Sequence, residues 1–317
     1  MKRPEAVHLL AGAAITAIAA ALWPGAAGAG PPATAPVAGA TTPAAEAVFP
    51  VTVASGDGSV TIPARPVRIL CLSASATQML YALGAGPQVV GVDEYSTWPA
   101  NAPRTKFTGA ETSAEDYLPL RPDLVIVAFR SGSVIQQLQK LDIPALLLAP
   151  ATTFANVDSQ LAELAAATGH RAAVSTVEAT IKTDITAALD KAGNAGRGQT
   201  YYIEVDPTYY TATSKTFIGS EFSLFGMRDI ADPAGRLSTY PQISAEYILK
   251  ANPDYIFLAD TVCCQQKPVS FARRPGFNVL RAVRLHHVIG VNDSVASQWG
   301  PHTIETFVAL LAGTLRP

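Results

Sequence analysis

Cysteine is scarce in this chain. Three cysteines in 317 residues are too few for a fold that disulfide bonds hold together. Charged residues make up only 15% of the chain, and the net charge of −2 leaves no basic excess for binding nucleic acid. The sequence contains no G-x-S-x-G elbow, no H-E-x-x-H pair and no P-loop motif. None of the five histidines forms an H-x3-H pair, so we expect no metal site, no intrinsic cofactor and no enzymatic activity.

Long apolar runs are also rare, and the one at the N-terminus has the features of a targeting signal. Lys2 and Arg3 precede the apolar stretch Leu9–Trp23, which is followed by proline and an Ala-Gly-Ala site. This order is typical of a secretory signal peptide over residues 1–29, either cleaved or kept as a membrane anchor. Residues 30–48 are mostly Pro, Ala, Gly and Thr, which predicts a disordered linker. We therefore expect an exported protein.

The rest of the chain alternates between strand and helix patterns. A Gly-Asp-Gly turn predicts a hairpin over residues 49–63, and RILCL, VVGV, LVIVAF, TYYIEV and YIFLAD predict buried parallel strands. Apolar residues at spacings of three and four predict one long helix over residues 171–192. The expected fold is α/β, with two Rossmann-like lobes that contain parallel sheets. The lobes span residues 49–170 and 194–317, and the connecting helix spans residues 171–193.

One phrase occurs once in each half: SAEDYLPLRPD at residues 113–123 and SAEYILKANPD at residues 244–254. In each copy we expect the serine to cap a short helix, the Pro-Asp pair to end it, and a buried strand to follow. The shared glutamates, Glu115 and Glu246, fall in the first helical turn, where the helix dipole favours acidic residues. Earlier in the chain, the run SATQ fits a capping box and predicts a helix cap at Ser75.

Aromatic side chains follow several of the predicted strands. The carboxyl ends of parallel strands are where α/β sheets bind ligands, and aromatic rings suit a bulky planar or amphipathic ligand. Arg130 is the best basic candidate for an anionic ligand group, although it could instead pair with a surface carboxylate. The predicted ligand contacts are Tyr95, Phe129, Arg130, Tyr209, Tyr240 and Trp299.

The adjacent pair Cys263 and Cys264 follows the strand YIFLAD, at the expected rim of a ligand cleft. In an oxidising compartment the pair could close a vicinal disulfide, or it could remain two free thiols. A bond from either cysteine to Cys71 is a third alternative. Because Cys71 lies in a predicted core strand of the other lobe, that bond is geometrically unfavourable.

Several stretches resemble landmarks of a known family. RPVRILCLSASATQMLYALGAGPQVVGVDEYSTWP, YPQISAEYILKANPDYIFL and SQWGPHTIETFVALL are similar to segments of the helical-backbone (class III) substrate-binding proteins of ABC importers. These are the periplasmic cobalamin-, siderophore- and haem-binding proteins, and the resemblance covers residues 50–317. It implies two lobes bridged by a long helix, with a ligand cleft between them. One departure is Gln78, where the family usually has glutamate.

The resemblance also implies roles for individual residues. In the family, one glutamate on each lobe docks onto arginines of the membrane permease, and Glu115 and Glu246 match those positions. Tyr95, Phe129 and Tyr240 match aromatic ligand positions of the cobalamin-binding branch.

The resemblance thus implies a monomeric receptor that binds cobalamin, a ferric siderophore or haem and delivers it to an ABC permease with its ATPase. A cofactor precursor such as F420-0, suggested by the Cys-Cys pattern, or a bare metal ion are the alternative ligands. A secreted hydrolase is the alternative outside the binding class.

Overall fold

The computed structural model describes residues 48–111, 113–129 and 133–315, and these belong to one compact unit. The predicted signal peptide and residues 30–47 of the predicted linker lie outside the described residues. The described chain begins with an antiparallel hairpin of β1 (Val51–Ser55) and β2 (Gly58–Ile62). The Gly-Asp-Gly turn joins the two strands, as the sequence predicts.

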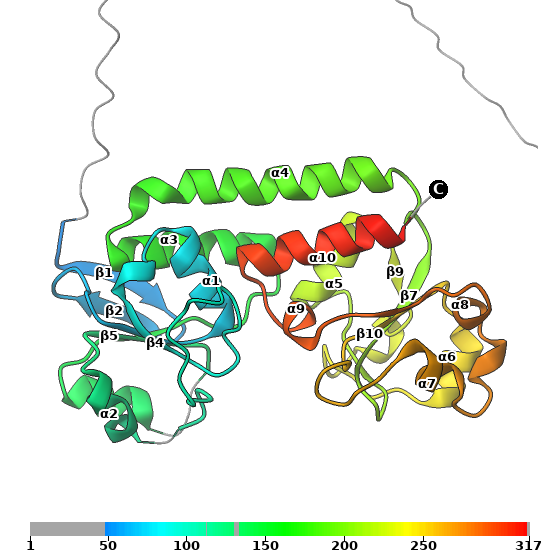
Figure 1. Cartoon of the computed structure of the whole chain (residues 1–317), viewed down its shortest axis with the longest axis horizontal. Coiled ribbons are helices and arrows are strands. Elements are labelled where there is room, and N and C mark those ends of the chain that lie inside the picture. Colours follow the sequence, from blue (N-terminus) through cyan, green and yellow to red (C-terminus); the bar gives the residue numbers. More distant parts are fainter. Residues whose placement is uncertain (1–47, 112, 130–132, 316–317) are drawn as a thin grey trace, which may run out of the picture. The chain divides into compact units, whose positions relative to one another are not determined.

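The first lobe is built on a four-stranded sheet with helices on both of its faces (Figure 1). The strand order is β4-β3-β5-β6, and every neighbouring pair is parallel. The strands are β3 (Ile69–Leu72), β4 (Val89–Val92), β5 (Leu124–Val127) and β6 (Ala145–Leu147). The helices are α1 (Ala74–Ala82), α2 (Val134–Lys140) and α3 (Phe154–Thr168), with 3-10 turns η1 (Gly86–Gln88) and η2 (Ala114–Leu120).

Strand β3 has this position because both of its faces are apolar. Ile69 and Cys71 pack into the cluster that contains residues of α1 and α3, whereas Leu70 and Leu72 pack into the cluster on the η2 and α2 side. Successive side chains of a strand point to opposite faces, so a continuous apolar run is what a strand covered on both sides requires.

The start of helix α1 corrects one prediction. The cap is Ser73, whose hydroxyl accepts a hydrogen bond from the Ala76 N–H at 3.3 Å, and not Ser75. The reason is that Ser73 is extended and follows β3 directly, so the helix begins as soon as the strand ends. Ser75 lies inside the helix, and its hydroxyl is available for a partner elsewhere in the chain.

The second lobe has a five-stranded sheet in which β10 lies between β11 and β7. Strands β7 and β10 are parallel, as predicted, and β11, which was not predicted from the sequence, is parallel to β10. Strand β8 pairs with β7 in the antiparallel direction. The strands are β7 (Thr200–Asp206), β8 (Tyr210–Thr211), β9 (Arg228–Asp229), β10 (Tyr255–Leu258) and β11 (Val288–Gly290). The helices are α5 (Phe217–Leu224), α6 (Ala245–Ala251), α7 (Pro268–Ala272) and α8 (Arg281–Arg284), with 3-10 turns η4 (Asp232–Ala234) and η5 (Phe277–Val279).

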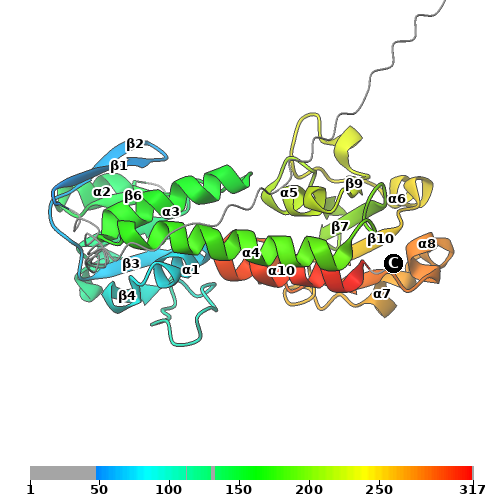
Figure 2. The same cartoon turned by 90° about the horizontal axis from the view of Figure 1, so that it is seen from above.

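Two helices connect the lobes, although the sequence predicts only one. Helix α4 (Val174–Ala192) follows the 3-10 turn η3 (Arg171–Ala173) and ends at Gly193, close to the predicted bounds. Helix α10 (Pro301–Thr314) follows the short helix α9 (Asp293–Ala296) and lies alongside α4 (Figure 2). The chain therefore crosses back to the first lobe before α10, and α10 then runs beside α4 from the first lobe to the second.

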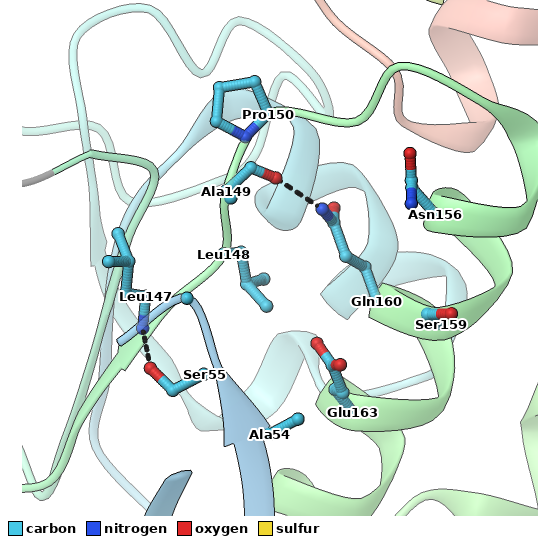
Figure 3. A pocket seen from close by; sticks show the side chains of 11 residues that line it. Ala54, Ser55, Leu147, Leu148, Ala149, Pro150, Asn156, Ser159, Gln160 and Glu163 are labelled. Atoms are coloured by element: carbon cyan, nitrogen blue, oxygen red, sulfur yellow. Dashed lines mark hydrogen bonds between the residues drawn. The ribbon is translucent and has the colours of Figure 1, made fainter. Parts of the chain in front are cut away.

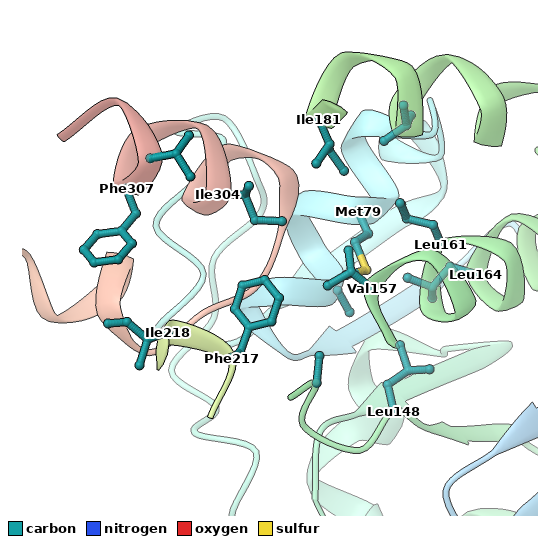
Figure 4. Packing of buried hydrophobic residues seen from close by; sticks show 14 of the residues in the cluster. Met79, Leu148, Val157, Leu161, Leu164, Ile181, Phe217, Ile218, Ile304 and Phe307 are labelled. Atoms are coloured by element: carbon teal, nitrogen blue, oxygen red, sulfur yellow. The ribbon is translucent and has the colours of Figure 1, made fainter. Parts of the chain in front are cut away.

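One apolar core runs through both lobes. Residues of α1, α3, α4, α5 and α10 converge in it, including Met79, Leu161, Ile181, Phe217 and Phe307 (Figure 4). The rings of Phe154 and Phe217, from different lobes, lie 5.1 Å apart. Because a close-packed interior does not deform continuously, this shared core predicts that the lobes move little against each other.

Candidate functional site

A hollow of about 340 Å³ lies at the carboxyl ends of the first-lobe strands. The residues that directly follow β3, β4 and β5 line it, namely Ser73, Asp93 and Ala128. The edge of an α/β sheet where the strands end is the usual ligand position. The volume is near the lower limit for small-molecule pockets, which is about 300 Å³.

Three of the predicted ligand contacts meet in this hollow. Tyr95 and Phe129 come from the loops after β4 and β5, and Trp299 comes from the segment between α9 and α10. Tyr95 is 56% exposed and Phe129 is 48% exposed. Large apolar side chains that stay this accessible are typical of a binding surface when they gather in one place.

The remaining predicted contacts do not line this hollow. Tyr209 packs into the second lobe, where its ring lies 6.1 Å from that of Phe277 and 5.2 Å from the Arg274 guanidinium. Tyr240 is also in the second lobe and is 51% exposed. Arg130 lies outside the described residues.

Asp93 gives the hollow an acidic character. Its side chain is only 4% exposed, and its Oδ1 has no hydrogen-bond partner among the described residues. Burial raises the pKa of Asp93 to about 6, although hydrogen bonds from Ser96 act in the opposite direction. An acceptor without a partner favours a ligand that donates hydrogen bonds over one that presents a carboxylate. Asp93 was not among the predicted contacts, but its position directly after a strand could have identified it.

A buried charged cluster lies at the corresponding strand ends of the second lobe. Glu204 accepts two hydrogen bonds of 2.6 Å from Arg274, a bidentate pair. Asp260, which is fully buried, has no partner for either oxygen among the described residues. Burial and the neighbouring Glu204 raise the pKa of Asp260 to about 7.

A second cavity, of about 230 Å³, lies between the hairpin and α3 (Figure 3). Gln160 and Glu163 line one side of it, and Ser55 lines the other. Burial raises the pKa of Glu163. Gln160 donates from Nε2 to the Ala149 carbonyl at 2.7 Å, which fixes the orientation of its amide.

The two repeated glutamates are exposed at the starts of corresponding helical segments. Glu115 follows the cap Ser113 of η2, and Glu246 follows the cap Ser244 of α6. Hydrogen bonds from the backbone and from Ser244 lower the pKa of Glu246, so this side chain is a carboxylate at neutral pH.

Cys263 and Cys264 are free thiols in the structure, and so is Cys71. Two free thiols are one of the alternatives that the sequence left open. The ring that adjacent cysteines close strains the peptide bond between them. The Val262 and Cys263 N–H groups donate to the Asp293 carboxylate at 2.8 and 2.7 Å.

Within residues 48–315, apart from the undescribed positions, no group of three His, Cys, Asp or Glu side chains lies close enough to hold a metal ion. No helix in the described part is long and apolar enough to cross a membrane.

Comparisons with known proteins agree with this architecture. The chain is 30% identical over 269 residues to the ABC transporter substrate-binding lipoprotein YvrC of Bacillus subtilis. The alignment covers 81% of this chain and 83% of YvrC. It is 28% identical over 268 residues to the cobalamin-binding protein of Halobacterium salinarum, with 81% and 72% covered.

A solved structure, the periplasmic haem-binding protein RhuT of Roseiflexus sp. RS-1 in apo form, superposes with a TM-score of 0.68 at 23% identity, covering 79% of this chain and 98% of that one. At this identity the likeness shows the fold. Residues 69–295 match the family model described as periplasmic binding protein. With this match over most of the chain, and with the YvrC identity, the chain belongs to the periplasmic binding protein family.

Proposed function

We propose that this chain is the extracytoplasmic receptor of an ABC importer and that it captures a bulky, ring-containing ligand of the corrinoid, haem or iron-chelate class. The observation that carries the proposal is the meeting of Tyr95, Phe129 and Trp299 in one hollow at the strand ends. These residues come from three distant parts of the sequence and share only their aromatic character. Aromatic rings provide a large contact area at little cost in conformational entropy.

The size of the hollow supports a ligand that both lobes share. A volume of about 340 Å³ accepts only part of a large macrocycle, since pockets for drug-sized ligands extend to about 1,000 Å³. Tyr240, half-exposed on the second lobe, would contact the other side of such a ligand. The names of the relatives agree with this class, because they include cobalamin-binding and haem-binding proteins.

The proposal is tested by titrating the purified protein with cyanocobalamin, haemin and a ferric hydroxamate siderophore. We expect one of them to bind, and we expect Tyr95→Ala and Phe129→Ala each to weaken that binding about tenfold or more. Leu141→Ala is the matched control, because Leu141 is a similarly exposed apolar residue at the end of α2, outside the hollow.

Native mass spectrometry of protein purified from its own host identifies the natural ligand. A zinc or manganese ion with no organic molecule would contradict the proposal. Binding that tolerates both aromatic substitutions would assign the ligand to another part of the molecule.

Delivery of the ligand requires contact with a permease, and Glu115 and Glu246 are the proposed docking residues. Each is exposed in the first turn after a serine cap, and the two belong to different lobes. Exposed charges of this kind steer encounter and fix the register of a complex more than they add affinity.

The double variant Glu115→Ala, Glu246→Ala is therefore expected to abolish uptake in cells while leaving the ligand affinity of the purified protein unchanged. Asp158→Ala together with Asp190→Ala is the charge-matched control, because both aspartates are exposed on other helices, α3 and α4. Normal uptake by the glutamate double variant would refute the docking role.

A further inference from the structure

The wall of the hollow that carries Trp299 belongs to neither sheet. The segment Ser297–Gly300 leaves the second lobe after α9 and reaches the first lobe at the start of α10, which contacts α1 and α4. Its side chains line the hollow at Ser297, Gln298 and Trp299. Because no strand pairing holds this segment, the position of Trp299 depends on other contacts.

Two first-lobe side chains hold Trp299 directly. Its backbone N–H donates to the Ser75 hydroxyl at 3.0 Å, and its indole Nε1–H donates to Gln160 Oε1 at 2.8 Å. The Gln160 amide can present its oxygen to the indole because its Nε2 donates to the Ala149 carbonyl (Figure 3). Both Ser75 and Gln160 are buried, so these contacts are shielded from water.

A single buried amide, that of Gln78, holds the chain on both sides of Trp299. Gln78 Nε2 donates to Gln298 Oε1 at 2.7 Å and to Thr303 Oγ1 at 2.8 Å, while Gln78 Oε1 accepts from the Thr303 N–H at 3.0 Å. The crossing chain also approaches Gln78 closely at Gly300, where a Cβ atom would lie 2.4 Å from Gln78 Oε1. Gln78 is 2% exposed.

We infer that Gln78 is a positioning residue, which fixes Trp299 as the wall of the ligand hollow by donating and accepting hydrogen bonds with the same amide. The inference rests on the proposed function in so far as Trp299 contacts the ligand. The chemistry requires an amide at this position. An ionised glutamate only accepts hydrogen bonds. Its carboxylate could still accept from the Thr303 N–H and hydroxyl, but it would face Gln298 Oε1 and remove the donor to that oxygen.

The test is Gln78→Glu, observed through the indole N–H resonance of Trp299 in the full-length 15N-labelled protein. Loss of that resonance in Trp299→Phe assigns it. At pH 5 the buried glutamic acid is protonated, because burial disfavours the charged form, and it can again donate to Gln298. We expect a wild-type resonance at pH 5 and a displaced or broadened one at pH 8. The wild-type protein, measured over the same range, accounts for the titration of Asp93, which also lines the hollow.

Gln78→Met is the second variant, because it keeps the volume but removes both polar groups. It should displace the resonance at every pH. If both variants keep the wild-type resonance at all pH values, Gln78 only fills space and the inference is wrong, whatever their melting temperatures.

Ligand affinity gives the independent measurement. For whichever of cyanocobalamin, haemin or the ferric hydroxamate binds the wild-type protein, we expect Gln78→Glu to bind about tenfold more weakly at pH 8 and normally at pH 5. A displaced resonance with unchanged affinity would overturn the role of Trp299 as a ligand wall. If no probe binds the wild-type protein, the proposed function fails, while the resonance still decides whether Gln78 positions Trp299.

Discussion

At the scale of single residues, the second lobe buries carboxyl groups that no cation accompanies among the described residues. Asp229 is the clearest example. Its Oδ1 accepts the Ala231 N–H at 2.7 Å, while its Oδ2 has no partner in the described part of the chain. Burial raises the pKa of Asp229 to about 7. A carboxyl group in this environment makes stability depend on pH.

Asp229→Asn is predicted to stabilise the protein at pH 8, on the order of 1–3 kcal/mol. In the wild type, the unfolded state loses the Asp229 proton near its ordinary pKa, about 4, whereas the folded state keeps it until about pH 7. The free energy of unfolding should therefore fall as the pH rises through this range. The asparagine variant keeps the acceptor for Ala231 but cannot ionise.

Urea unfolding at several pH values measures this effect, and the advantage of the variant should grow from pH 4 to pH 8. Asp190→Asn, which removes an exposed charge on α4, serves as the control. An advantage that is the same at every pH would mean that the ionisation of Asp229 is not its cause.

At the scale of elements, the repeated phrase builds the same unit twice. In each copy the aspartate after the proline accepts hydrogen bonds from backbone N–H groups at the start of a sheet strand in its own lobe. That strand is β3 in the first lobe and β7 in the second. Asp123 accepts from the Val67 and Arg68 N–H groups at 2.8 and 2.9 Å, and Asp254 accepts from the Thr200 N–H at 2.8 Å. The Pro-Asp pair therefore does more than end a helix, because its carboxylate sets where the neighbouring strand begins.

Asp123→Ala and Asp254→Ala should each lower the free energy of unfolding by about 1–3 kcal/mol, since each leaves backbone N–H groups without an acceptor. Asp116→Ala removes an exposed aspartate from η2 and should change stability by less than about 0.5 kcal/mol. Denaturation in urea provides the comparison. If either Asp123→Ala or Asp254→Ala lowers the free energy of unfolding by less than Asp116→Ala does, water replaces the missing carboxylate.

The caps and strands of this unit could be predicted because their signals lie in the eleven-residue phrase and in the apolar run directly after it. Ser113 and Ser244 are caps as expected. The type of helix was harder to predict. The segment η2 is a 3-10 helix that contains Pro119, whereas α6 is an α-helix. Proline removes a backbone donor, and this local difference separates the two copies.

At the scale of the whole molecule, the feature that the sequence could not reveal is the return of the chain to the first lobe just before α10. The contact between Ser75 and Trp299 spans 224 positions in the sequence, and no local pattern encodes a hydrogen bond of that range. Trp299 could be predicted as a ligand contact because its large aromatic side chain stands out in the sequence. Gln160, which orients it, lies in the middle of an ordinary amphipathic helix, α3, and nothing in its neighbours distinguishes it.

The shared core predicts that the two lobes lose stability together. Phe307 of α10 is fully buried, and its ring meets that of Phe222, a second-lobe residue, at 5.3 Å. Phe307→Ala should destabilise the protein by about 3–5 kcal/mol. Amide hydrogen exchange should then show reduced protection in β3 and β10 alike.

Phe129→Ala is the control for this experiment, because Phe129 is half-exposed and its removal leaves no cavity in the core. Loss of protection confined to β10 would mean that the lobes are separate folding units despite their common core.

The return of the chain to the first lobe also affects the order in which the two lobes are completed during synthesis. Synthesis delivers the chain from its N-terminus, so the first lobe is the first to be made. Yet α10 covers surfaces of α1 and α4, and Thr303 satisfies the amide of Gln78. These contacts can form only after α10 has been made, and Thr303 lies 225 positions after Gln78. The first lobe, although it is made first, is thus completed only after the strands of the second lobe, and a nascent chain that stops short of α10 lacks contacts in both lobes.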